Sequence, residues 1–300
     1  MTSTGTAWPE GTVCTIGSLV EEVRGQLHAA GIESADQEAL WLIEHATGLP
    51  GLRQVVDRDR LVSEHEFAMV KRVVARRTDR EPLQYILRTQ EFCGLEFEVN
   101  PTVLIPRPET ELLVRETVRH LARVPHPTLV DVGAGSGCLA ITLAQSISEA
   151  KILAIDLSAR ALETAKRNAR RHELEAVITW LEGDLLAPLT GLGFERAVTA
   201  IVSNPPYIRE ADWPGLQPEV SRYEPRTALV AGPRGTELHE RLLNEAIPHL
   251  VPGGFLIMEL GLGQSAEVQA LLAANPAYAS ITIVQDDAGM DRVVIAERAG

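Results

Sequence analysis

Residues 128–137, TLVDVGAGSG, place an apolar strand directly before a loop that contains three glycines. Glycines let the backbone turn tightly and let a ligand approach the N-terminus of the following helix closely. The fingerprint of dinucleotide-binding folds would need a glycine at the position of Cys138, so the loop by itself is only a weak signal for nucleotide binding of any kind. The candidate cofactor-binding residues of this stretch are Asp131, Gly133, Ala134, Gly135, Ser136 and Gly137.

From this loop onward, strand-like and helical patterns alternate along the chain. Strands are expected at 128–132, 151–155, 177–181, 199–203 and 254–260, and helices at 159–171 and 236–250. This alternation predicts an α/β fold with a doubly wound parallel sheet. Two last strand-like runs, 280–285 and 292–297, leave no room for a helix between them and should pair as an antiparallel hairpin at one sheet edge. Such an ending is untypical of a dinucleotide-binding fold.

Acidic residues follow two of the expected strands. Asp156 ends the strand after the glycine loop, where a carboxylate can accept both hydroxyls of an adenosine ribose, while Ser158 can cap the next helix. Asp184 follows the third strand, where it could meet an adenine amino group while Leu185 packs against the ring. An ordinary turn aspartate is the alternative for Asp184.

A stiff corner, Asn204-Pro205-Pro206-Tyr207, follows the strand at 199–203. Proline fixes φ at about −65° and donates no backbone N–H, so the corner offers one amide side chain, free carbonyls and one ring. These groups match a planar NH2 group, which has two donors and a flat face.

The glycine loop, Asp156, Asp184 and Asn204 all fall at the carboxyl ends of successive strands, where open α/β sheets bind their ligands. An adenosine site beside a corner shaped for an NH2 group suggests methyl transfer from S-adenosylmethionine to a nitrogen.

The composition weighs against several other classes of function. The net charge of −13 argues against wholesale binding to a nucleic-acid backbone. The three cysteines lie far apart without a Cys-x-x-Cys pair, so neither a disulfide framework nor a metal site is expected. No apolar stretch approaches the ~20 residues that span a bilayer, and the N-terminus lacks a secretion-signal pattern, so a cytoplasmic location is expected.

The front of the chain, 1–87, reads as a small helical domain, with 1–15 expected to be disordered because it is rich in Thr, Ser and Gly. Capping-box pairs that predict helix starts are Ser18 with Glu21, Ser34 with Gln37, and Ser63 with Glu66. Alternating apolar residues at 95–99, a turn at Asn100-Pro101 and a second run at 103–105 predict a β-hairpin linker over 88–107. The second domain then occupies 108–300.

Five cations fall within ten residues of the helical domain. They are Lys71, Arg72, Arg76, Arg77 and Arg80. A solvated helix face is the favoured interpretation, and a docking surface for an acidic or RNA-bound partner is the alternative.

Several motifs give the chain a resemblance to a known family. They are EPLQYI at 81–86, EF at 91–92, LIPRPETE at 104–111, SNPPYI at 203–208, YEPR at 223–226 and DRVV at 291–294. Together they resemble the release factor glutamine methyltransferase family over nearly the whole chain. The Asn-Pro-Pro-Tyr motif also occurs in DNA-adenine and some RNA-guanine methyltransferases, but its combination with Ile-Pro-Arg-Pro-Glu-Thr-Glu is highly specific.

The resemblance implies a helical substrate-recognition domain joined by a hairpin to a Rossmann-like methyltransferase domain of seven strands. It implies S-adenosylmethionine as cofactor and class I peptide chain release factors as protein partners, with the glutamine of their Gly-Gly-Gln motif as the methylated residue. No direct contact with DNA or a membrane is expected, and the ribosome would take part only indirectly.

Within that framework, we expect the Asn204 side-chain oxygen and the Pro205 carbonyl each to accept one N–H of the glutamine amide. Pro206 and Tyr207 complete the substrate site, with Tyr207 against the amide plane and Leu104 closing the pocket opposite. No general base is needed, because an N-protonated amide is strongly acidic.

Arg107 and Glu111 are expected to support these residues without touching the substrate. The alternative is that they serve helix-terminus electrostatics and form an ion pair. Two positions depart from the family pattern: Arg88 stands where glycine is usual, and Leu185 stands where some members carry a tryptophan near the adenine.

Two rival functions remain open at this point. One is a methyltransferase that acts on a ribosomal-protein glutamine or on a nucleobase amine. The other is an adenosine-binding interaction module without catalytic activity, for which an amide clamp would have no use.

Overall fold

The computed structural model describes residues 14–300 and divides the chain into two compact units. The first unit comprises the residues up to Arg88 together with Pro218–Tyr223, and the second comprises Thr89–Gln217 and Glu224–Gly300. None of the helices in the described part has the length and apolar character needed to cross a membrane.

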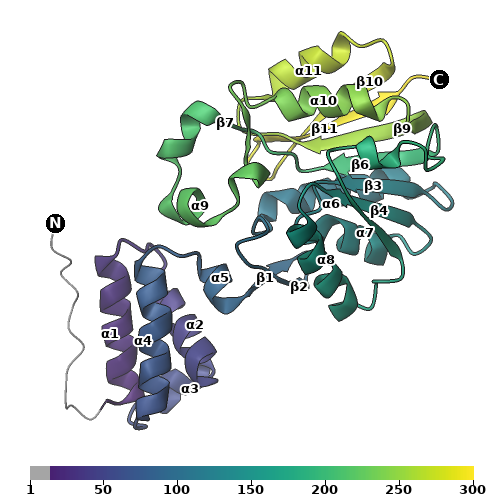
Figure 1. The fold of residues 1–300 in the computed structure, drawn as a ribbon. Coiled ribbons are helices and arrows are strands. Elements are labelled where there is room, and N and C mark those ends of the chain that lie inside the picture. Colours follow the sequence, from purple (N-terminus) through teal and green to yellow (C-terminus); the bar gives the residue numbers. More distant parts are fainter. Residues whose placement is uncertain (1–13) are drawn as a thin grey trace. The chain divides into compact units, whose positions relative to one another are not determined.

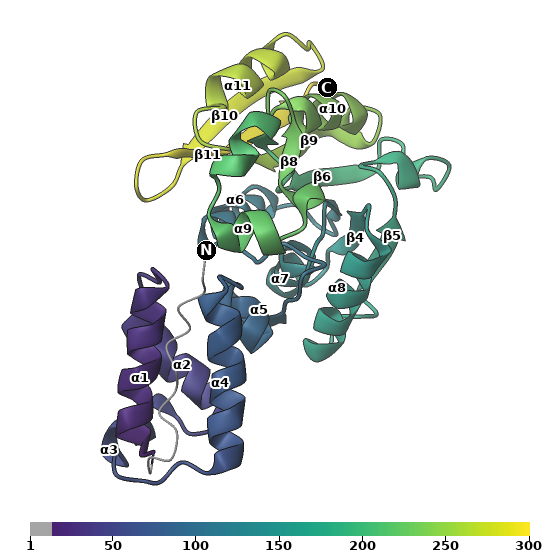
Figure 2. The same ribbon diagram turned by 60° about the vertical axis from the view of Figure 1, so that its left-hand side comes forward.

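The first unit is helical. Its helices are α1 (Ile16–Ala29), α2 (Ala35–Thr47), α3 (Gly51–Val56), α4 (Glu64–Thr78), α5 (Leu83–Leu87) and α9 (Pro218–Tyr223). In Figure 2, α1, α2 and α4 lie side by side, and their apolar faces bury a common core that includes Leu19, Leu42 and Val74.

The helix starts agree in part with the capping boxes expected from the sequence. Ser63 and Glu66 form a reciprocal capping box at α4. The box at α1 is formed by Thr15 and Ser18, so this helix begins earlier than the pair Ser18–Glu21 indicated. Ser34 precedes α2 but makes no capping hydrogen bond. The disorder expected at 1–15 falls, apart from Cys14 and Thr15, on residues outside the described range.

The solvated-face interpretation of the basic stretch is wrong for its C-terminal half. Arg77 is buried and binds Glu38 at 2.6 Å and Glu219 of α9 at 2.9 Å. Arg80 binds Glu219 at 2.8 Å and also donates to the Gly31 carbonyl. A buried guanidinium needs such partners because desolvation of an unpaired charge costs several kcal/mol. These cations therefore hold helices together.

Arg88 ends α5 in the left-handed conformation, with φ of 64° and ψ of 20°. The left-handed conformation costs a residue with a Cβ about 1–2 kcal/mol of conformational energy, whereas glycine adopts it without this cost. This explains why glycine suits the position. Strand β1 nevertheless starts at the next residue, Thr89, in a regular register.

The second unit opens with the hairpin of β1 (Thr89–Phe92) and β2 (Leu95–Glu98). The expected hairpin is wrong in its pairing: its two strands are joined at Cys93-Gly94, and 103–105 is not a strand. The chain does turn after Asn100, whose carbonyl accepts the Val103 N–H at 3.1 Å. Cys93 and Gly94 both have positive φ, 50° and 76°, which matches the two-residue turns that suit the twist of a hairpin. The Asn100 side chain supports the turn that follows it by accepting the Thr102 N–H at 2.9 Å.

The rest of the second unit is an α/β sandwich around one sheet. Its strands are β3 (Thr128–Val132), β4 (Lys151–Asp156), β5 (Ile178–Glu182), β6 (Val198–Ser203), β9 (Leu250–Glu259), β10 (Tyr278–Gln285) and β11 (Asp291–Arg298). Its helices are α6 (Glu111–Leu121), α7 (Cys138–Ser146), α8 (Ala159–Arg171), α10 (Glu237–Ala246) and α11 (Ser265–Ala273). Shorter elements are the 3-10 turns η1 (Pro108–Thr110), η2 (Ala187–Leu189), η3 (Glu210–Gly215) and η4 (Arg226–Ala228), and the small strand pair β7 (Ile208–Arg209) and β8 (Val230–Gly232).

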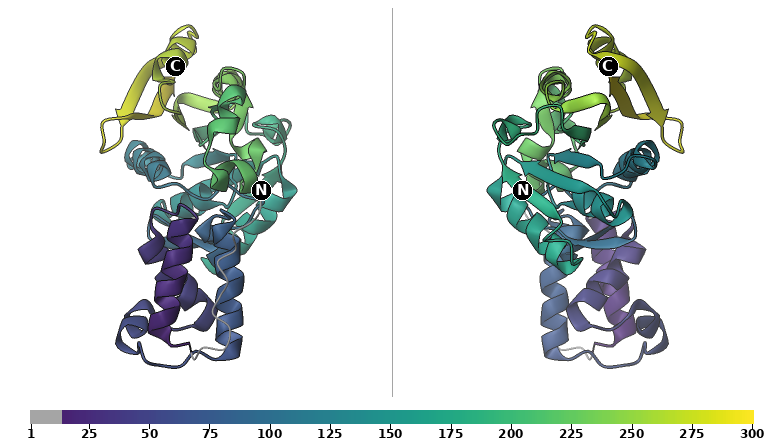
Figure 3. Two further views of the ribbon diagram at one scale, coloured as in Figure 1. Left: turned by 90° about the vertical axis from the view of Figure 1, so that its left-hand side faces the viewer. Right: turned by 90° about the vertical axis from the view of Figure 1, so that its right-hand side faces the viewer.

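The seven strands run in the order β10-β11-β9-β6-β3-β4-β5. Strands β9, β6, β3, β4 and β5 are parallel, and β11 pairs antiparallel with both β9 and β10. The doubly wound fold and the antiparallel ending expected from the sequence are therefore confirmed. The yellow pair β10–β11 forms one end of the sheet in both views of Figure 3.

Side chains alternate between the two faces of the sheet. Leu129 packs in a core with α6 and α7, and its neighbour Val130 packs in a second core with α10 and α11. In Figure 1, α10 and α11 lie above the strands and α6, α7 and α8 lie below them. This arrangement leaves the carboxyl ends of β3, β4, β5 and β6 at one edge, where the predicted site residues lie.

Candidate active site

The loop after β3 has the open backbone that a ligand requires. Gly133 and Gly135 have φ of 80° and 55°, and the first N–H groups of the loop bind the Ile155 carbonyl of β4. A Cβ on Gly133 would come no closer than 3.9 Å to the Asn204 carbonyl oxygen, and one on Gly135 would find only the Gly133 carbonyl at 3.9 Å. The glycines therefore border free space that reaches toward Asn204.

Asp131 lies beneath this loop and is 1% exposed. Its Oδ2 accepts the Ala140 N–H of α7 at 3.1 Å, while its Oδ1 is buried without a partner among the described residues. Burial, together with the charge of Asp156, raises the pKa of Asp131 to about 7. A buried acceptor without a partner is costly, so Oδ1 is a free place for a ligand donor.

Asp156 ends β4 beside the loop. Its two carboxylate oxygens accept the backbone N–H groups of Gly135 and Ser158, each at 2.8 Å. Burial raises the pKa of Asp156 in spite of these bonds. Each oxygen keeps a second lone pair, so the carboxylate can still accept ribose hydroxyls. Ser158 caps α8 by accepting the Ala161 N–H, as expected.

Asp184 and Leu185 follow β5, as the sequence indicated, and both make contacts within the protein. Asp184 is exposed and pairs with Arg241 of α10 at 2.8 Å. Leu185 has a φ of 45° and packs against the core shared with α10. An adenine contact by Asp184 would compete with the Arg241 pair.

The Asn204–Tyr207 corner is held from several sides. Ser203 donates to the Val132 carbonyl at 2.7 Å, which ties the end of β6 to β3. The Tyr207 N–H donates to the Leu229 carbonyl at 3.1 Å, and Gln264 donates to the Tyr207 carbonyl at 2.8 Å. Such fixed placement is what an acceptor pair needs in order to act without reorganisation.

The Asn204 side chain has a defined orientation. Its Nδ2 donates to Thr110 Oγ1 at 3.1 Å, and Thr110 Oγ1 donates to Glu259 Oε2 at 2.7 Å. The Tyr207 hydroxyl donates to the other Glu259 oxygen over 3.4 Å. Thr110 and Glu259 were not expected from the sequence, although Thr110 stands inside the quoted motif at 104–111.

The segment 104–107 is held by Glu224, which is buried. Glu224 accepts the Ile105 N–H at 3.1 Å and forms an ion pair with Arg107. Burial and the charge of Glu259 raise the pKa of Tyr207, and the positive charge of Arg107 opposes this rise. Leu104 is half-buried in the same segment.

Relatives of this chain extend over both of its units. Residues 18–87 match the PrmC N-terminal domain family, and residues 109–214 match the Methyltransferase small domain family. The release factor glutamine methyltransferase of Geobacter sulfurreducens is 43% identical over 283 residues, which cover 94% of this chain and 96% of the relative. The chain belongs to the release factor glutamine methyltransferase family.

A further relative supports the family, and a solved structure supports the fold. The release factor glutamine methyltransferase of Moorella thermoacetica is 40% identical over 94% of this chain and 97% of the relative. The hMettl16 catalytic domain, solved in complex with MAT2A 3′UTR hairpin 6, is 16% identical and shares the fold with a TM-score of 0.56, over 75% of this chain and 81% of that one. The family, the enzyme class and the fold class expected from the motifs are therefore confirmed.

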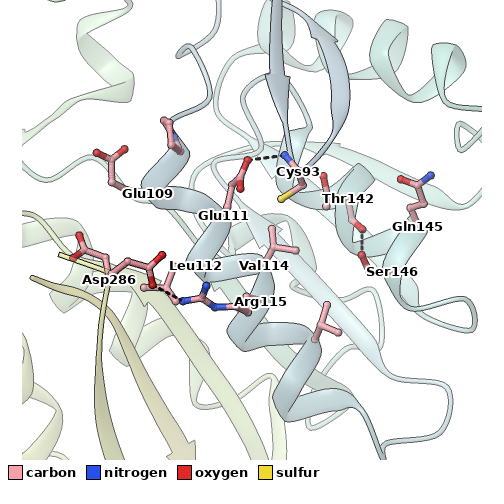
Figure 4. A pocket seen from close by; sticks show the side chains of 13 residues that line it. Cys93, Glu109, Glu111, Leu112, Val114, Arg115, Thr142, Gln145, Ser146 and Asp286 are labelled. Carbon is pink, nitrogen blue, oxygen red and sulfur yellow. Dashed lines mark hydrogen bonds and ion pairs between the residues drawn. The ribbon is translucent and has the colours of Figure 1, made fainter. Parts of the chain in front are cut away.

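Glu111 of this methyltransferase lies away from the corner. Its Oε1 accepts the Cys93 N–H at 2.8 Å and so fixes the turn of the hairpin (Figure 4). Together with Thr142 and Asp286 it lines a pocket of about 520 Å³. The residues that line this pocket include none from 131–137 or 203–207, so it is separate from the site at the strand ends.

The strand-end site of this family member fits a nucleoside cofactor. It offers a buried acceptor on Asp131, a carboxylate on Asp156 and glycines that leave space between them and Asn204. Among residues 14–300, no group of three or more His, Cys, Asp and Glu side chains is arranged to hold a metal ion.

Proposed function

We propose that this chain transfers a methyl group from S-adenosylmethionine to the side-chain amide nitrogen of the glutamine in the Gly-Gly-Gln motif of class I peptide chain release factors. The observation that carries the site assignment is the oriented Asn204 amide. Its Nδ2 is engaged by Thr110, so its Oδ1 is left to accept from a substrate, beside the glycine loop. The family to which the chain belongs supports the choice of a protein glutamine.

The cofactor would be held by Asp131, Asp156 and the loop at 133–137. Asp131 Oδ1 would accept from its amino group, and Asp156 from its ribose hydroxyls, since these are the acceptors with free lone pairs. When bound, S-adenosylmethionine supplies an electrophilic methyl group. Leu185 would offer an apolar wall in place of a stacking ring.

The substrate amide would be held by Asn204 and Pro205. The Asn204 Oδ1 and the Pro205 carbonyl each accept one N–H of the glutamine, which turns the nitrogen lone pair away from both acceptors. An amide nitrogen is a poor nucleophile because its lone pair is delocalised into the carbonyl. Fixed acceptors favour the positive charge that grows on this nitrogen, and positioning contributes the rest of the rate.

Tyr207 and Leu104 would exclude water from the amide. Hydrogen bonds to Leu229 and Gln264 fix the backbone of Tyr207, so its ring can pack against the amide plane. After transfer, the nitrogen releases one proton to solvent, and no side chain has to act as base because an N-protonated amide is strongly acidic. Arg107 would act indirectly, through its ion pair with Glu224.

The substrate assignment is tested with labelled S-adenosylmethionine. The wild-type enzyme is incubated separately with a release factor, the same factor with its motif glutamine changed to Ala, ribosomal proteins, and RNA. Label is expected in the first sample alone. Label in the Gln→Ala factor, or only in ribosomal protein or RNA, would overturn the assignment.

The site assignment is tested with Asn204→Ala. Loss of one preorganised hydrogen-bonding partner costs about 3 kcal/mol in the transition state, so turnover should fall at least roughly a hundredfold. Binding of S-adenosylmethionine, measured by calorimetry, should persist. The control is Asn244→Ala, which changes an exposed asparagine on α10 and should leave turnover unchanged. Near-normal turnover in Asn204→Ala would contradict the mechanism.

A further inference from the structure

We propose that Thr110 and Glu259 form a positioning relay that decides which end of the Asn204 amide faces the substrate. This inference rests on the proposed function of Asn204 and adds two residues to it. Neither residue touches the reacting atoms in the scheme above. Their effect is exerted through the direction of hydrogen bonds.

The direction of an asparagine amide is not decided by its shape. Its oxygen and its NH2 group occupy nearly the same space, so a half-turn about the last side-chain bond exchanges an acceptor for a pair of donors. With Oδ1 toward the substrate, Asn204 accepts from a glutamine NH2 group. With Nδ2 toward the substrate, two NH2 groups face each other and repel. Clamping therefore requires a fixed orientation.

Thr110 provides that orientation because its hydroxyl has a single proton. Thr110 Oγ1 lies 2.7 Å from Glu259 Oε2 and 3.1 Å from Asn204 Nδ2. An ionised carboxylate only accepts, so Thr110 must donate to Glu259 and must accept from its other neighbour. Only the NH2 end of Asn204 can donate. The amide oxygen is then directed away from Thr110.

Both relay residues are buried deeply enough to enforce this order. Thr110 is 3% exposed and Glu259 is 2% exposed, so water is not available to replace either partner. Glu259 ends β9, which neighbours β6, the strand that leads into Asn204. A buried carboxylate is costly to keep, and a stability role alone would be filled as well by an apolar side chain.

The charges around Glu259 have opposing effects. Arg292 of β11 favours its ionised form, and Glu109 disfavours it. The Tyr207 hydroxyl donates to it, whereas His239 of α10 binds only its backbone carbonyl, at 2.8 Å. Burial is the largest effect, and it raises the pKa of Glu259 to about 7.

Because the pKa of Glu259 lies near neutral pH, a change of pH can reverse the direction of the hydrogen bonds in the relay. A protonated Glu259 can donate to Thr110, and the Thr110 proton is then free to point at Asn204. In that arrangement Thr110 donates to the amide oxygen of Asn204 and no longer needs its NH2 group as a donor, which favours the unproductive orientation. Turnover should therefore fall as the pH drops through about 7, while binding of S-adenosylmethionine changes less.

Three variants separate the relay from a merely structural role. Thr110→Val keeps the shape but removes the hydroxyl, and we expect kcat to fall ten- to a hundredfold with little change in KM for S-adenosylmethionine. Thr110→Ser retains the hydroxyl and should restore kcat to within threefold of wild type. The side chain introduced by Glu259→Gln cannot ionise, so kcat of this variant should no longer fall as the pH drops below about 7. Thermal unfolding of each variant reports whether it folds.

A second measurement does not depend on activity. The side-chain NH2 resonances of Asn204, identified by their loss in Asn204→Ala, are followed by ¹H–¹⁵N NMR between pH 5.5 and 8.5. We expect a shift with a midpoint near pH 7 that persists in Thr110→Ser and disappears in Thr110→Val and Glu259→Gln. Chemical shifts that change neither with pH nor in Thr110→Val would overturn the relay.

The outcomes distinguish the two proposals. If the wild type methylates the release factor and Asn204→Ala does not, but Thr110→Val is fully active with an unchanged pH profile, the relay fails and the proposed function stands. If no release factor is methylated while the Asn204 resonances titrate as described, the proposed function fails and the relay stands as a property of the site.

Discussion

Gly235 shows how little room surrounds the Asn204–Tyr207 corner. It has a φ of 83°, and an added Cβ would lie 2.6 Å from the Tyr207 carbonyl oxygen and 2.7 Å from Gln264 Nε2. Neither atom can yield without breaking the hydrogen bond between Gln264 and Tyr207 that fixes the corner. Close backbone approach is therefore the reason for glycine at this position.

We expect Gly235→Ala to destabilise the second unit by about 2–3 kcal/mol and to reduce turnover at least tenfold, because overpacking adds to backbone strain. Gly289→Ala is the matched control, since Gly289 has a φ of 77° but nothing within 4 Å of the added Cβ. That control should cost only the strain, about 1–2 kcal/mol, and leave turnover unchanged. Denaturant unfolding and the methyl-transfer assay make the comparison. Equal losses in both variants would remove the clash as a cause.

At the same scale, the residues predicted from the sequence are those with a local signature. The glycine loop, Asp156 and Asn204 each directly follow an apolar strand, so their neighbours in the chain are enough to place them. Thr110 and Glu259 have no such signature. They meet across 149 positions of the chain, and their contact depends on which strand lies beside which.

Among the elements, the hairpin shows where a strong turn signal misleads. Asn100-Pro101 has the composition of a turn, and Cys93 does not. The chain turns at both places, but the paired strands are joined at Cys93-Gly94, because this choice pairs Gln90 with Phe97 and buries Phe92 and Phe97 together. Burial of two aromatic rings outweighs a preference among turn residues. Helices and buried strands follow more directly from the sequence, because their pattern spans many residues.

The short helix α9 depends on buried charges for its place in the first unit. Glu219 pairs with Arg77 and Arg80, and Tyr223 donates to Asp79 at 2.9 Å. Burial opposes ionisation of Glu219, but these cations hold its pKa below its ordinary value. The ionised carboxylate therefore contributes to stability at neutral pH.

We expect Glu219→Gln to destabilise the first unit by about 1–2 kcal/mol, since hydrogen bonds to a charged group are stronger than those to an amide. Backbone amides of 218–223 should exchange with deuterium roughly tenfold faster. Glu21→Gln serves as control, because Glu21 is 58% exposed and its pair with Arg24 contributes little. Unchanged exchange at 218–223 would show that the charge of Glu219 does not hold α9 in place.

For the whole molecule, the parallel sheet and its antiparallel edge follow from the alternation of strand and helix patterns. The division into units follows less directly. Residues 218–223 lie between strands of the second unit in sequence but group with the first unit in space. The pairing of Arg77 and Arg80 with Glu219 and the hydrogen bond of Tyr223 to Asp79 account for this. A run of cations in the sequence does not indicate which acidic residue it will pair with. Charge pairing over such distances cannot be obtained from local patterns.

The pH dependence of stability is the property in which the buried carboxylates of the second unit act together. Burial raises the pKa of both Glu259 and Asp131 to about 7. Between the ordinary carboxyl pKa of about 4 and this value, the folded state holds protons that the unfolded state has released. Stability due to these two groups therefore falls as the pH rises from about 4 to 7, and the loss is complete above that range. The lowered pKa of His239 acts in the opposite direction below about pH 6.5, so the total curve alone does not isolate Glu259.

The difference between wild type and Glu259→Gln does isolate it. A shift of this size corresponds to about 3 kcal/mol, so relative to the wild type the variant should gain about 1–3 kcal/mol between pH 5 and pH 8. Because two units need not unfold together, the measurement is hydrogen exchange of the amides in β9, which reports the second unit directly. A difference that stays constant with pH would mean that Glu259 titrates at its ordinary value. The same carboxylate could then no longer make the orientation of Asn204 depend on pH near 7.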